Sequence, residues 1–395
     1  MKIWIPKESS AGERRVALVP ANVAALSKRG LQIVVEAGAG AAAGYADEQY
    51  QAAGAVIEAS REAGFAAASI VVQVQTAGQA PAQLESDLAL LRSTQLLIGS
   101  MDPLGNPRFA AALAERGVTG VAMELIPRIS RAQAMDVLSS MAMIAGYKAV
   151  LLAAEQSPRM FPMNMTAAGT LQPARVFVMG AGVAGLQACA TARRLGAVVE
   201  AYDVRAAARE QILSVGAKPI ELDLQTSSAE GSGGYAAAQG EAFLARQREL
   251  MGEVLAQQDV VITTAAVPGA RSPILVTAEH VRNMKPGAVI VDLAAERGGN
   301  CELTRAGELV VEHGVTILGP LNVPSSVPFH ASQMYGKNIE NTLAHLISAE
   351  GALQLDFEDE IIAGTVVTHD GQVIHPRLRE LLGLTIAQPS PGQGA

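Results

Sequence analysis

Cysteine, aromatic side chains and an excess of basic charge are all scarce or missing in this chain of 395 residues. The two cysteines, Cys189 and Cys301, exclude a disulfide framework and a metal site built from several cysteines, and they favour a reducing compartment. Only 4% of the residues are aromatic, so aliphatic side chains must build the core. A net charge of −8 without a basic stripe argues against a nucleic-acid partner.

Long apolar runs are missing as well. The first apolar stretch ends at Pro6 and is too short for a signal peptide. No window of about 20 residues is apolar without polar interruption, so the sequence predicts no membrane span. Hydrophobic residues still make up 49% of the chain, enough for a large core. At about 150 residues per domain, the length predicts about two to three domains.

Short apolar runs alternate with helix-compatible segments along most of the chain. Predicted strands cover residues 3–5, 33–35, 70–74, 96–98 and 121–123, and a second series covers 176–179, 198–202, 260–263 and 289–291. Helices are predicted at about 131–155 and at 338–349, and a hairpin at 366–374. Strands that alternate with helices indicate parallel sheets. We therefore predict an α/β fold of two Rossmann-like domains with parallel sheets and a cleft between them.

The predicted domains are interleaved along the chain. The N-terminal domain comprises residues 1–140 and 325–384, and a dinucleotide-binding domain comprises residues 141–324. The Ser/Gly-rich segment 226–234 is predicted to be mobile. Residues 385–395, which contain Pro, Gly and Gln, are predicted to form a flexible tail.

A glycine-rich turn follows the strand predicted at 176–179. It reads Gly180-Ala181-Gly182-Val183-Ala184-Gly185 and opens a predicted helix. In a dinucleotide-binding turn the first glycine permits the tight turn, the second lets the backbone approach a pyrophosphate, and the third lets helix and strand pack closely. Free N–H groups at the helix start favour phosphate charge. The order of strand, turn, helix and second strand predicts nucleotide binding, and the alternative is a tight turn without a ligand.

An acidic residue ends the next predicted strand. Asp203 lies 18 residues after Gly185, close to the spacing expected for the acid that holds a ribose diol. Its carboxylate would repel a 2′-phosphate, which favours NAD(H) over NADP(H). Arg205 weakens this preference, because its guanidinium could pair with a phosphate.

Polar residues are concentrated between residues 124 and 139. If this stretch is helical, Gln133, Asp136 and Ser139 are each three residues apart and share one face, near Arg128. Such side chains suit the positioning of a carboxamide and a ribose. The alternative is structural: Ser130 and Gln133 form a capping box, and Asp136 is a solvated helix residue.

Histidine is missing from the first 279 residues, because all six histidines lie at or beyond His280. Dehydrogenases that act on 2-hydroxy or 2-amino acids move a proton as well as a hydride, and usually use His or Lys for it. This distribution favours chemistry without a proton step.

These residues together resemble the NAD(H)-binding component of proton-translocating NAD(P) transhydrogenase, over almost the whole chain. The most specific stretch runs from Met123 through Arg128, Gln133 and Asp136 to Tyr147. Further matching motifs are Met165-Thr166-Ala167-Ala168-Gly169, Gly233-Gly234-Tyr235-Ala236, Thr263-Thr264-Ala265 and Asp292-Leu293-Ala294. The resemblance implies direct hydride transfer between NAD(H) on this chain and NADP(H) on a partner.

The resemblance also implies roles for particular residues. Arg128, Gln133, Asp136 and Ser139 would hold the nicotinamide and its ribose, and Gln133 would also reach toward NADP(H) on the partner. Asp203 would hold the adenosine ribose, and Gly234 and Tyr235 would lie on a loop that closes over the cofactor. The full set of implied cofactor contacts is Arg128, Ile129, Ser130, Gln133, Asp136, Ser139, Gly180, Gly182, Val183, Ala184, Gly185, Asp203, Val204, Arg205, Gly234, Tyr235 and Ala265.

Two alternatives stay open at this point. Alanine dehydrogenase shares the fold and uses an Arg, a Lys and a His in its first domain. Arg15 matches the Arg, but Gln73 stands at the Lys position and Ser100 near the His position, so the proton chemistry of oxidative deamination is missing. A non-catalytic NAD-binding protein is the other alternative.

The resemblance extends to assembly. It implies a homodimer that works with an NADP(H)-binding beta subunit and a membrane-spanning subunit. Some transhydrogenase chains continue into membrane helices, whereas this sequence ends at Ala395. We therefore expect a cytoplasmic subunit that associates with the inner membrane through its partners.

Overall fold

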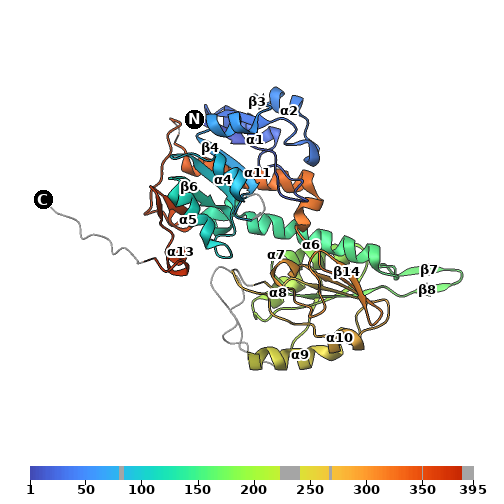
Figure 1. Ribbon diagram of the computed structural model, residues 1–395. Coiled ribbons are helices and arrows are strands. Elements are labelled where there is room, and N and C mark those ends of the chain that lie inside the picture. Colours follow the sequence, from blue (N-terminus) through green and yellow to red (C-terminus); the bar gives the residue numbers. More distant parts are fainter. Residues whose placement is uncertain (80–83, 223–240, 267–268, 349, 385–395) are drawn as a thin grey trace. The chain divides into compact units, whose positions relative to one another are not determined.

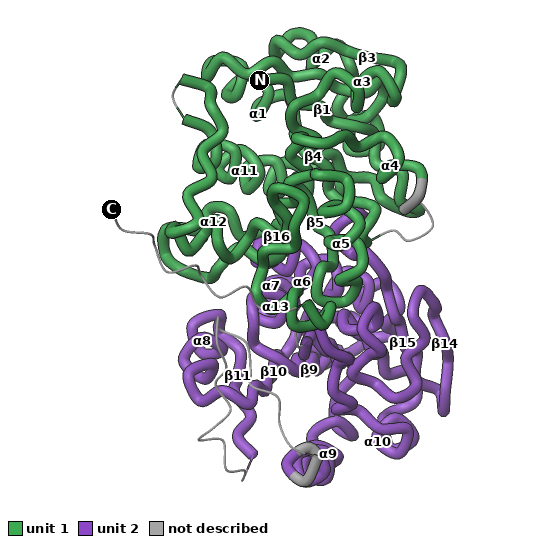
Figure 2. Tube along the Cα trace, turned by 60° about the vertical axis from the view of Figure 1, so that its left-hand side comes forward, with its two compact units in different colours: residues 1–138, 328–395 green, residues 139–327 purple. Residues whose placement is uncertain are grey.

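The chain folds into two compact units (Figure 2), and a computed structural model describes residues 1–79, 84–222, 241–266, 269–348 and 350–384. Unit 1 comprises residues 1–138 and 328–395, and unit 2 comprises residues 139–327. The segment 226–234 and the tail 385–395, both predicted to be mobile, lie outside the described residues.

Unit 1 is an eight-stranded sheet in the order β17-β16-β6-β5-β4-β1-β2-β3, flanked by helices (Figure 1). Its strands are β1 (Lys2–Ile5), β2 (Gln32–Glu36), β3 (Val56–Glu58), β4 (Ile70–Gln75), β5 (Leu96–Ser100), β6 (Thr119–Ala122), β16 (Val366–His369) and β17 (Gln372–Val373). The first six are parallel to their neighbours, and β16 is antiparallel to both β6 and β17.

The helices of unit 1 are α1 (Pro20–Ser27), α2 (Asp47–Ala52), α3 (Arg61–Ala67), α4 (Leu84–Leu90), α5 (Pro107–Glu115), α11 (Pro328–Leu346), α12 (Glu360–Thr365) and α13 (Pro376–Leu381). Short 3₁₀ turns are η1 (Ala41–Ala43), η3 (Met123–Leu125) and η4 (Ser130–Met135). Trp4 is fully buried, and its ring meets Phe65 edge-on at 6.5 Å. A Cβ at Gly64 would overlap the indole of Trp4, so α3 needs glycine there to approach β1.

Unit 2 is a seven-stranded sheet in the order β11-β10-β9-β12-β13-β15-β14, parallel except for β14, which is antiparallel to β15. Its strands are β9 (Arg175–Met179), β10 (Val198–Tyr202), β11 (Lys218–Pro219), β12 (Val260–Thr263), β13 (Val289–Asp292), β14 (Leu309–Glu312) and β15 (Val315–Leu318). Its helices and 3₁₀ turns are α7 (Val183–Arg194), α8 (Ala208–Ser214), α9 (Glu241–Ala256), α10 (Ala278–Asn283), η6 (Ala295–Arg297) and η7 (Val323–Ser326). A separate hairpin, β7 (Asn164–Thr166) and β8 (Gly169–Leu171), projects away from the rest of the unit (Figure 1).

The parallel strands are apolar on both faces, which is why the sequence shows runs rather than alternation. Val176 to Val178 in β9, Val260 to Ile262 in β12 and Val289 to Val291 in β13 are all fully buried. Helices cover both faces of such a sheet, so every side chain of a central strand meets the core. The prediction of two Rossmann-like units with parallel sheets is confirmed.

Two helix predictions need correction. The helix predicted at about 131–155 is divided: η4 ends at Met135, Asp136 is extended at φ −72° and ψ 95°, and α6 (Val137–Gln156) starts afterwards. The helix predicted at 338–349 begins ten residues earlier, at Pro328, and ends at Leu346. Pro328 occupies the first turn, where a missing N–H has no cost.

Candidate functional site

The glycine-rich turn of unit 2 joins the end of β9 to the start of α7. Gly180 has a φ of +97°, which strongly favours glycine, and its N–H donates to the carbonyl of Tyr202 at 2.8 Å. A Cβ at Gly185 would overlap the carbonyl oxygen of Gly180, so the third glycine lets α7 cross close to the turn. A Cβ at Gly182 would meet nothing within 4 Å. The second glycine therefore borders open space, while the other two are enclosed.

The first turn of α7 presents backbone donors to that space. Gly182 is the N-cap and makes no side-chain cap hydrogen bond, and the first N–H groups of a helix have no partner within it. Val183 and Ala184 contribute two of these groups. This donor set and the open Cβ position at Gly182 fit a pyrophosphate.

Asp203 follows β10 and is engaged on both carboxylate oxygens. Oδ2 accepts the N–H of Ala181 at 2.7 Å, and the Arg205 guanidinium donates to Oδ1 and Oδ2 at 2.9 Å each. The backbone N–H of Arg205 donates to Oδ1 at 2.9 Å. Both side chains are largely buried, with 7% and 15% of their surface exposed. A ribose diol at this carboxylate would have to take the place of the guanidinium, which is the residue that left cofactor preference open in the sequence.

The loop after β12 lies against the glycine turn and is held by a side chain that sequence reasoning missed. Thr264 Oγ1 donates to the carbonyl of Gly180 at 3.0 Å. Asn300 is fully buried, and its amide accepts from the N–H of Ala265 at 3.0 Å and donates to the Ala265 carbonyl at 2.9 Å. The N–H of Asn300 donates in turn to the buried carboxylate of Asp292 at 2.8 Å. Only the doublet Gly298-Gly299 before it signalled a tight, ordered turn.

The polar stretch of unit 1 forms the turn η4 rather than one face of an α-helix. Gln133 is in η4, Asp136 is extended, and Ser139 is the third residue of α6, so the predicted shared helix face is wrong. The predicted capping box is also wrong, because Ile129 rather than Ser130 is the N-cap and it makes no side-chain cap hydrogen bond.

Several polar groups of this stretch still lie close together. Arg128 Nε lies 3.8 Å from Asp136 Oδ2. Gln133 is exposed, and none of the residues that the structure describes hydrogen-bonds its side chain. Val204 follows Asp203, at the end of β10. Gly234 and Tyr235 lie outside the described residues.

Buried ionisable groups surround the carboxyl ends of the unit 1 strands. Burial raises the pKa of Glu8 to about 8, although its carboxylate accepts the N–H groups of Val74 and Gln75 at 2.6 and 3.1 Å. Burial likewise raises the pKa of Glu124 to about 7, and its Oε1 accepts the N–H groups of Met101 and Asp102 at 2.6 Å each.

The residues that match the substrate-binding set of alanine dehydrogenase are occupied structurally. Arg15 is 6% exposed and forms an ion pair of 2.6 Å with Glu13. Gln73 is buried and donates to Asp87 at 3.2 Å. Neither Gln73 nor Ser100 has a side chain that takes up a proton near neutral pH.

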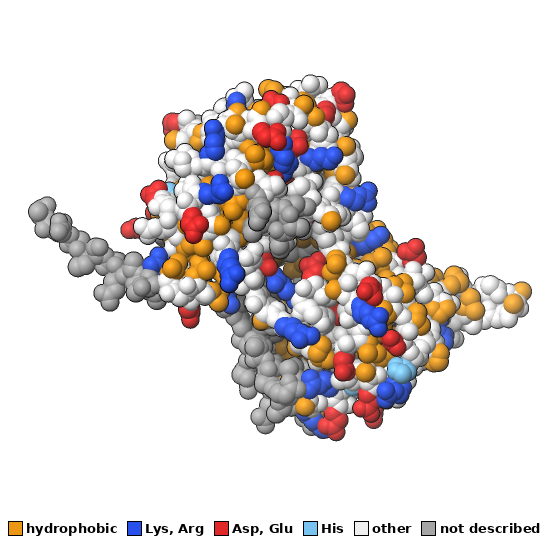
Figure 3. Space-filling view, in the orientation of Figure 1, with side chains coloured by type: hydrophobic (Ala, Val, Ile, Leu, Met, Phe, Trp, Pro, Cys, Tyr) orange, Lys and Arg blue, Asp and Glu red, His pale blue; other side chains and the backbone are white. Residues whose placement is uncertain are grey.

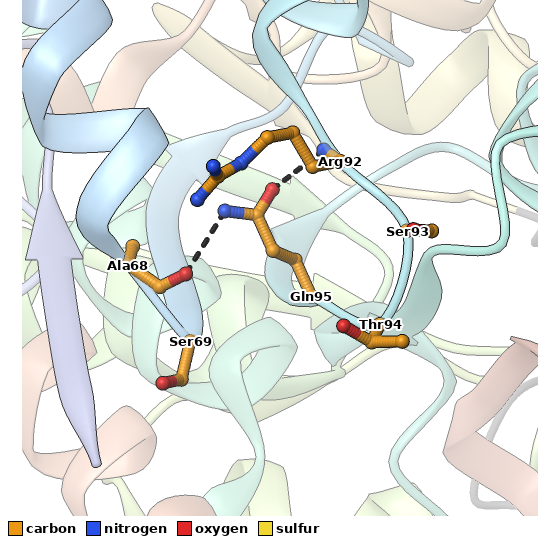
Figure 4. A pocket seen from close by; sticks show the side chains of 6 residues that line it. All are labelled: Ala68, Ser69, Arg92, Ser93, Thr94 and Gln95. Atoms are coloured by element: carbon orange, nitrogen blue, oxygen red, sulfur yellow. Dashed lines mark hydrogen bonds between the residues drawn. The ribbon is translucent and has the colours of Figure 1, made fainter.

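A pocket of about 390 Å³ lies at the opposite, amino-terminal edge of the unit 1 sheet (Figure 4). Gln95 closes it, because its Nε2 donates to the carbonyls of Phe65 and Ala68 and its Oε1 accepts the N–H of Arg92. Ligands of open α/β sheets bind beyond the carboxyl ends of the strands, so this pocket is a by-product of the turn. Among the described residues, no three His, Cys, Asp or Glu side chains group as metal ligands.

One helix of the described chain is long and apolar enough to span a membrane. It is α6, with 20 residues, a mean hydropathy of 1.7 and 39% of the tested window buried. Ala149, Val150 and Ala153 of this helix are fully buried in the core of unit 2. A Cβ at Gly146 would overlap the carbonyl oxygen of Ala184, so α6 packs directly on α7. These contacts are those of a core helix, which meets the same length and composition criteria.

Comparison with known proteins agrees with this geometry. The family described as "Alanine dehydrogenase/PNT, N-terminal domain" matches residues 4–145, and "Alanine dehydrogenase/PNT, C-terminal domain" matches residues 149–376. The chain is 48% identical to an NAD(P) transhydrogenase subunit alpha of Rhodospirillum rubrum, over 96% of this chain and 99% of that protein.

Solved structures and more distant relatives complete the comparison. The crystal structure of transhydrogenase from Sinorhizobium meliloti has a TM-score of 0.81 and 43% identity, over 95% of this chain and 100% of that one. Alanine dehydrogenase of Bacillus subtilis is only 28% identical, over 97% of this chain and 95% of that protein. The chain therefore belongs to the alanine dehydrogenase/PNT family, among the NAD(P) transhydrogenase alpha subunits.

Proposed function

We propose that this chain is the NAD(H)-binding subunit of a proton-translocating transhydrogenase and passes hydride directly between NAD(H) and NADP(H) held by a partner subunit. The observation that carries the proposal is Gln133: an exposed amide, without a partner among the described residues, on an otherwise fixed turn. The residues at the Lys and His positions of alanine dehydrogenase, Gln73 and Ser100, supply no proton-transferring group. Hydride transfer between two nicotinamides needs none.

The two units contribute different contacts. In unit 2 the backbone from Gly180 to Gly185, including Val183 and Ala184, holds the pyrophosphate. Asp203, with Val204 and Arg205 beside it, holds the adenosine ribose, and Ala265 lines the site next to the turn. In unit 1 Arg128, Ile129, Ser130, Gln133 and Asp136 hold the nicotinamide and its ribose, together with Ser139 of α6. Gly234 and Tyr235 close over the bound cofactor.

Positioning is the work left to the protein. The nicotinamide of NADH, when bound, supplies the hydride. The Arg128 and Asp136 side chains orient the carboxamide and the ribose hydroxyls, and Gln133 reaches toward the second cofactor. Holding two reactants in a productive geometry can contribute about 7–11 kcal/mol to a barrier without any acid or base.

We infer further that the chain is a homodimer, with β7 and β8 at its interface. All six residues of these strands are exposed, and a two-stranded hairpin alone is marginally stable in water. Met163, Met165 and Leu171 are 56%, 75% and 51% exposed, and Figure 3 shows hydrophobic side chains along this projection. A second copy of the chain would bury them.

The partners of the dimer are an NADP(H)-binding beta subunit and a membrane-spanning subunit. Proton translocation takes place in the membrane-spanning subunit and is coupled to hydride transfer through conformation. The chain is thereby held at the cytoplasmic face of the inner membrane.

Mixing tests the proposed function. The purified chain is combined with an NADP(H)-binding transhydrogenase domain, NADPH and an NAD analogue of distinct absorbance, with controls that lack each protein. We expect turnover only in the mixture. Turnover of alanine or pyruvate by this chain alone would contradict the proposal and favour an amino-acid dehydrogenase.

Gln133→Asn gives the sharper test. The shorter amide cannot reach as far, so the transfer rate should fall at least about tenfold while NADH binding, measured by its fluorescence, changes little. If every reaction were unaffected, the chain would be a non-catalytic NAD-binding protein.

A further inference from the structure

Two amide side chains of α11 donate to a single backbone carbonyl in η4. The Nδ2 atoms of Asn338 and Asn341 each lie 2.9 Å from the carbonyl oxygen of Ala134. Residues three apart share one face of a helix, so both amides reach the same point. A carbonyl oxygen has two lone pairs, and this pair of donors uses both. We call Asn338 and Asn341 the amide clamp.

The amide clamp acts on the residue next to Gln133. Ala132 is fully buried and Met135 is 7% exposed, so both flanks of Gln133 are anchored in unit 1. Arg131 adds an ion pair of 2.6 Å with Asp359. The backbone around Gln133 is therefore fixed on several sides, while its side chain stays exposed.

Asn338 is an expensive residue for a purely structural position. It is 5% exposed, and its Oδ1 is buried without a hydrogen-bond partner. A buried acceptor left unsatisfied lowers stability, so an aliphatic side chain would serve packing better. The amide is explained by what its other atom does, which is to hold the Ala134 carbonyl.

We propose that Asn338 and Asn341 are positioning residues for hydride transfer, which fix the backbone at Ala134 so that Gln133 presents its amide in one orientation. This inference rests on the proposed function. Displacement of a reacting group by about 1 Å is enough to slow a reaction about a hundredfold. Loss of the clamp should therefore slow transfer more than it weakens NADH binding, because the pyrophosphate site lies in unit 2.

The test compares Asn338→Ala, Asn341→Ala and the double variant with Asn22→Ala. Asn22 is a matched control: it is buried, and its Nδ2 bonds α11 at Glu340, at 2.8 Å, rather than η4. Three quantities are measured: the Kd for NADH, the transfer rate at saturating cofactors, and hydrogen exchange of a peptide that covers residues 128–136. Asn341→Ala removes a partly exposed side chain and keeps the test possible if loss of Asn338 impairs folding.

We expect the double variant to exchange faster over residues 128–136 and to transfer hydride about tenfold more slowly, with a Kd for NADH within about threefold of the parent. Asn22→Ala should change neither exchange in that peptide nor the rate. Unchanged exchange would overturn the clamp whatever the rates. Faster exchange with an unchanged rate would overturn its positioning role. Failure of the parent chain to transfer hydride would count against the proposed function instead.

Discussion

At the scale of single residues, Asp203 is the side chain on which cofactor preference depends. Its carboxylate already accepts from Ala181 and Arg205, so it is held in place before a ribose arrives. Such preorganisation lowers the cost of ordering the site when a ligand binds.

Asp203→Asn should weaken NADH binding about tenfold, because one acceptor oxygen becomes a donor that faces the Ala181 N–H or the guanidinium. Loss of a charged hydrogen bond costs about 1.5–3 kcal/mol. The control is Asp259→Asn, since Asp259 accepts a backbone N–H at 2.9 Å at the start of β9. Titration of NADH fluorescence decides: equal losses in both variants would show that only folding, and not the ribose site, was disturbed.

Glu124 makes a prediction about pH. Burial raises its pKa to about 7 from an ordinary 4.5, and its Oε2 is buried without a hydrogen-bond partner among the described residues. The folded chain keeps a proton that the unfolded chain loses, so this group costs nothing below about pH 4.5, and stability falls as the pH rises through 7. Glu8, with a pKa of about 8, acts in the same direction.

Glu124→Gln mimics the protonated form and keeps the acceptor for Met101 and Asp102. The free energy of unfolding in urea should therefore fall less between pH 5 and 8 than in the parent, by on the order of 2 kcal/mol, while the slope due to Glu8 remains. Glu302→Gln is the control, at an exposed carboxylate that accepts the N–H of Ala278 at 2.8 Å. An unchanged pH slope in Glu124→Gln would refute this assignment.

At the scale of elements, the junction of β9 and α7 separates two uses of glycine. A Cβ at Gly185 would overlap the Gly180 carbonyl, whereas a Cβ at Gly182 would enter open space. Gly185→Ala should therefore destabilise unit 2 by about 1–3 kcal/mol. Gly182→Ala should leave the free energy of unfolding nearly unchanged and weaken NADH binding at least about tenfold, because its methyl group occupies the place of the pyrophosphate. Equal NADH affinity in Gly182→Ala and the parent would mean that the phosphates bind elsewhere.

Elements were predictable from sequence where packing on both faces leaves a strong signal. The central strands show as apolar runs because helices cover both sides of each sheet. The segment 130–136 was misread, because Ser130, Gln133 and Asp136 are spaced as well for one α-helix as for a 3₁₀ turn followed by an extended residue. The start of α11 was missed despite Pro328, since the small residues between it and Asn338 are weak helix formers.

The candidate site divides in the same way. Glycine spacing, and the acid that follows, depend on local backbone geometry and can be read directly. Asn338 and Ala134 lie 204 residues apart, and Asn300 and Ala265 lie 35 apart. No local pattern announces such a pair, because it exists only once the chain has folded.

At the scale of the whole molecule, the hairpin β7–β8 predicts assembly. Met165→Asp places a charge on the most exposed of the three apolar side chains, so the mass measured by light scattering at micromolar concentration should fall from dimer to monomer. Val311→Asp is the control, at an apolar residue of β14 that is 63% exposed. A dimer that persists in Met165→Asp would place the interface elsewhere.

The central claim is hydride transfer without a proton step, and an isotope label tests it most directly. NADPH that carries deuterium at the transferring position of its nicotinamide is mixed with the NAD analogue, this chain and the NADP(H)-binding domain in ordinary water. We predict that the reduced analogue retains the full label. Label lost to solvent, or product formed without the partner domain, would contradict the account.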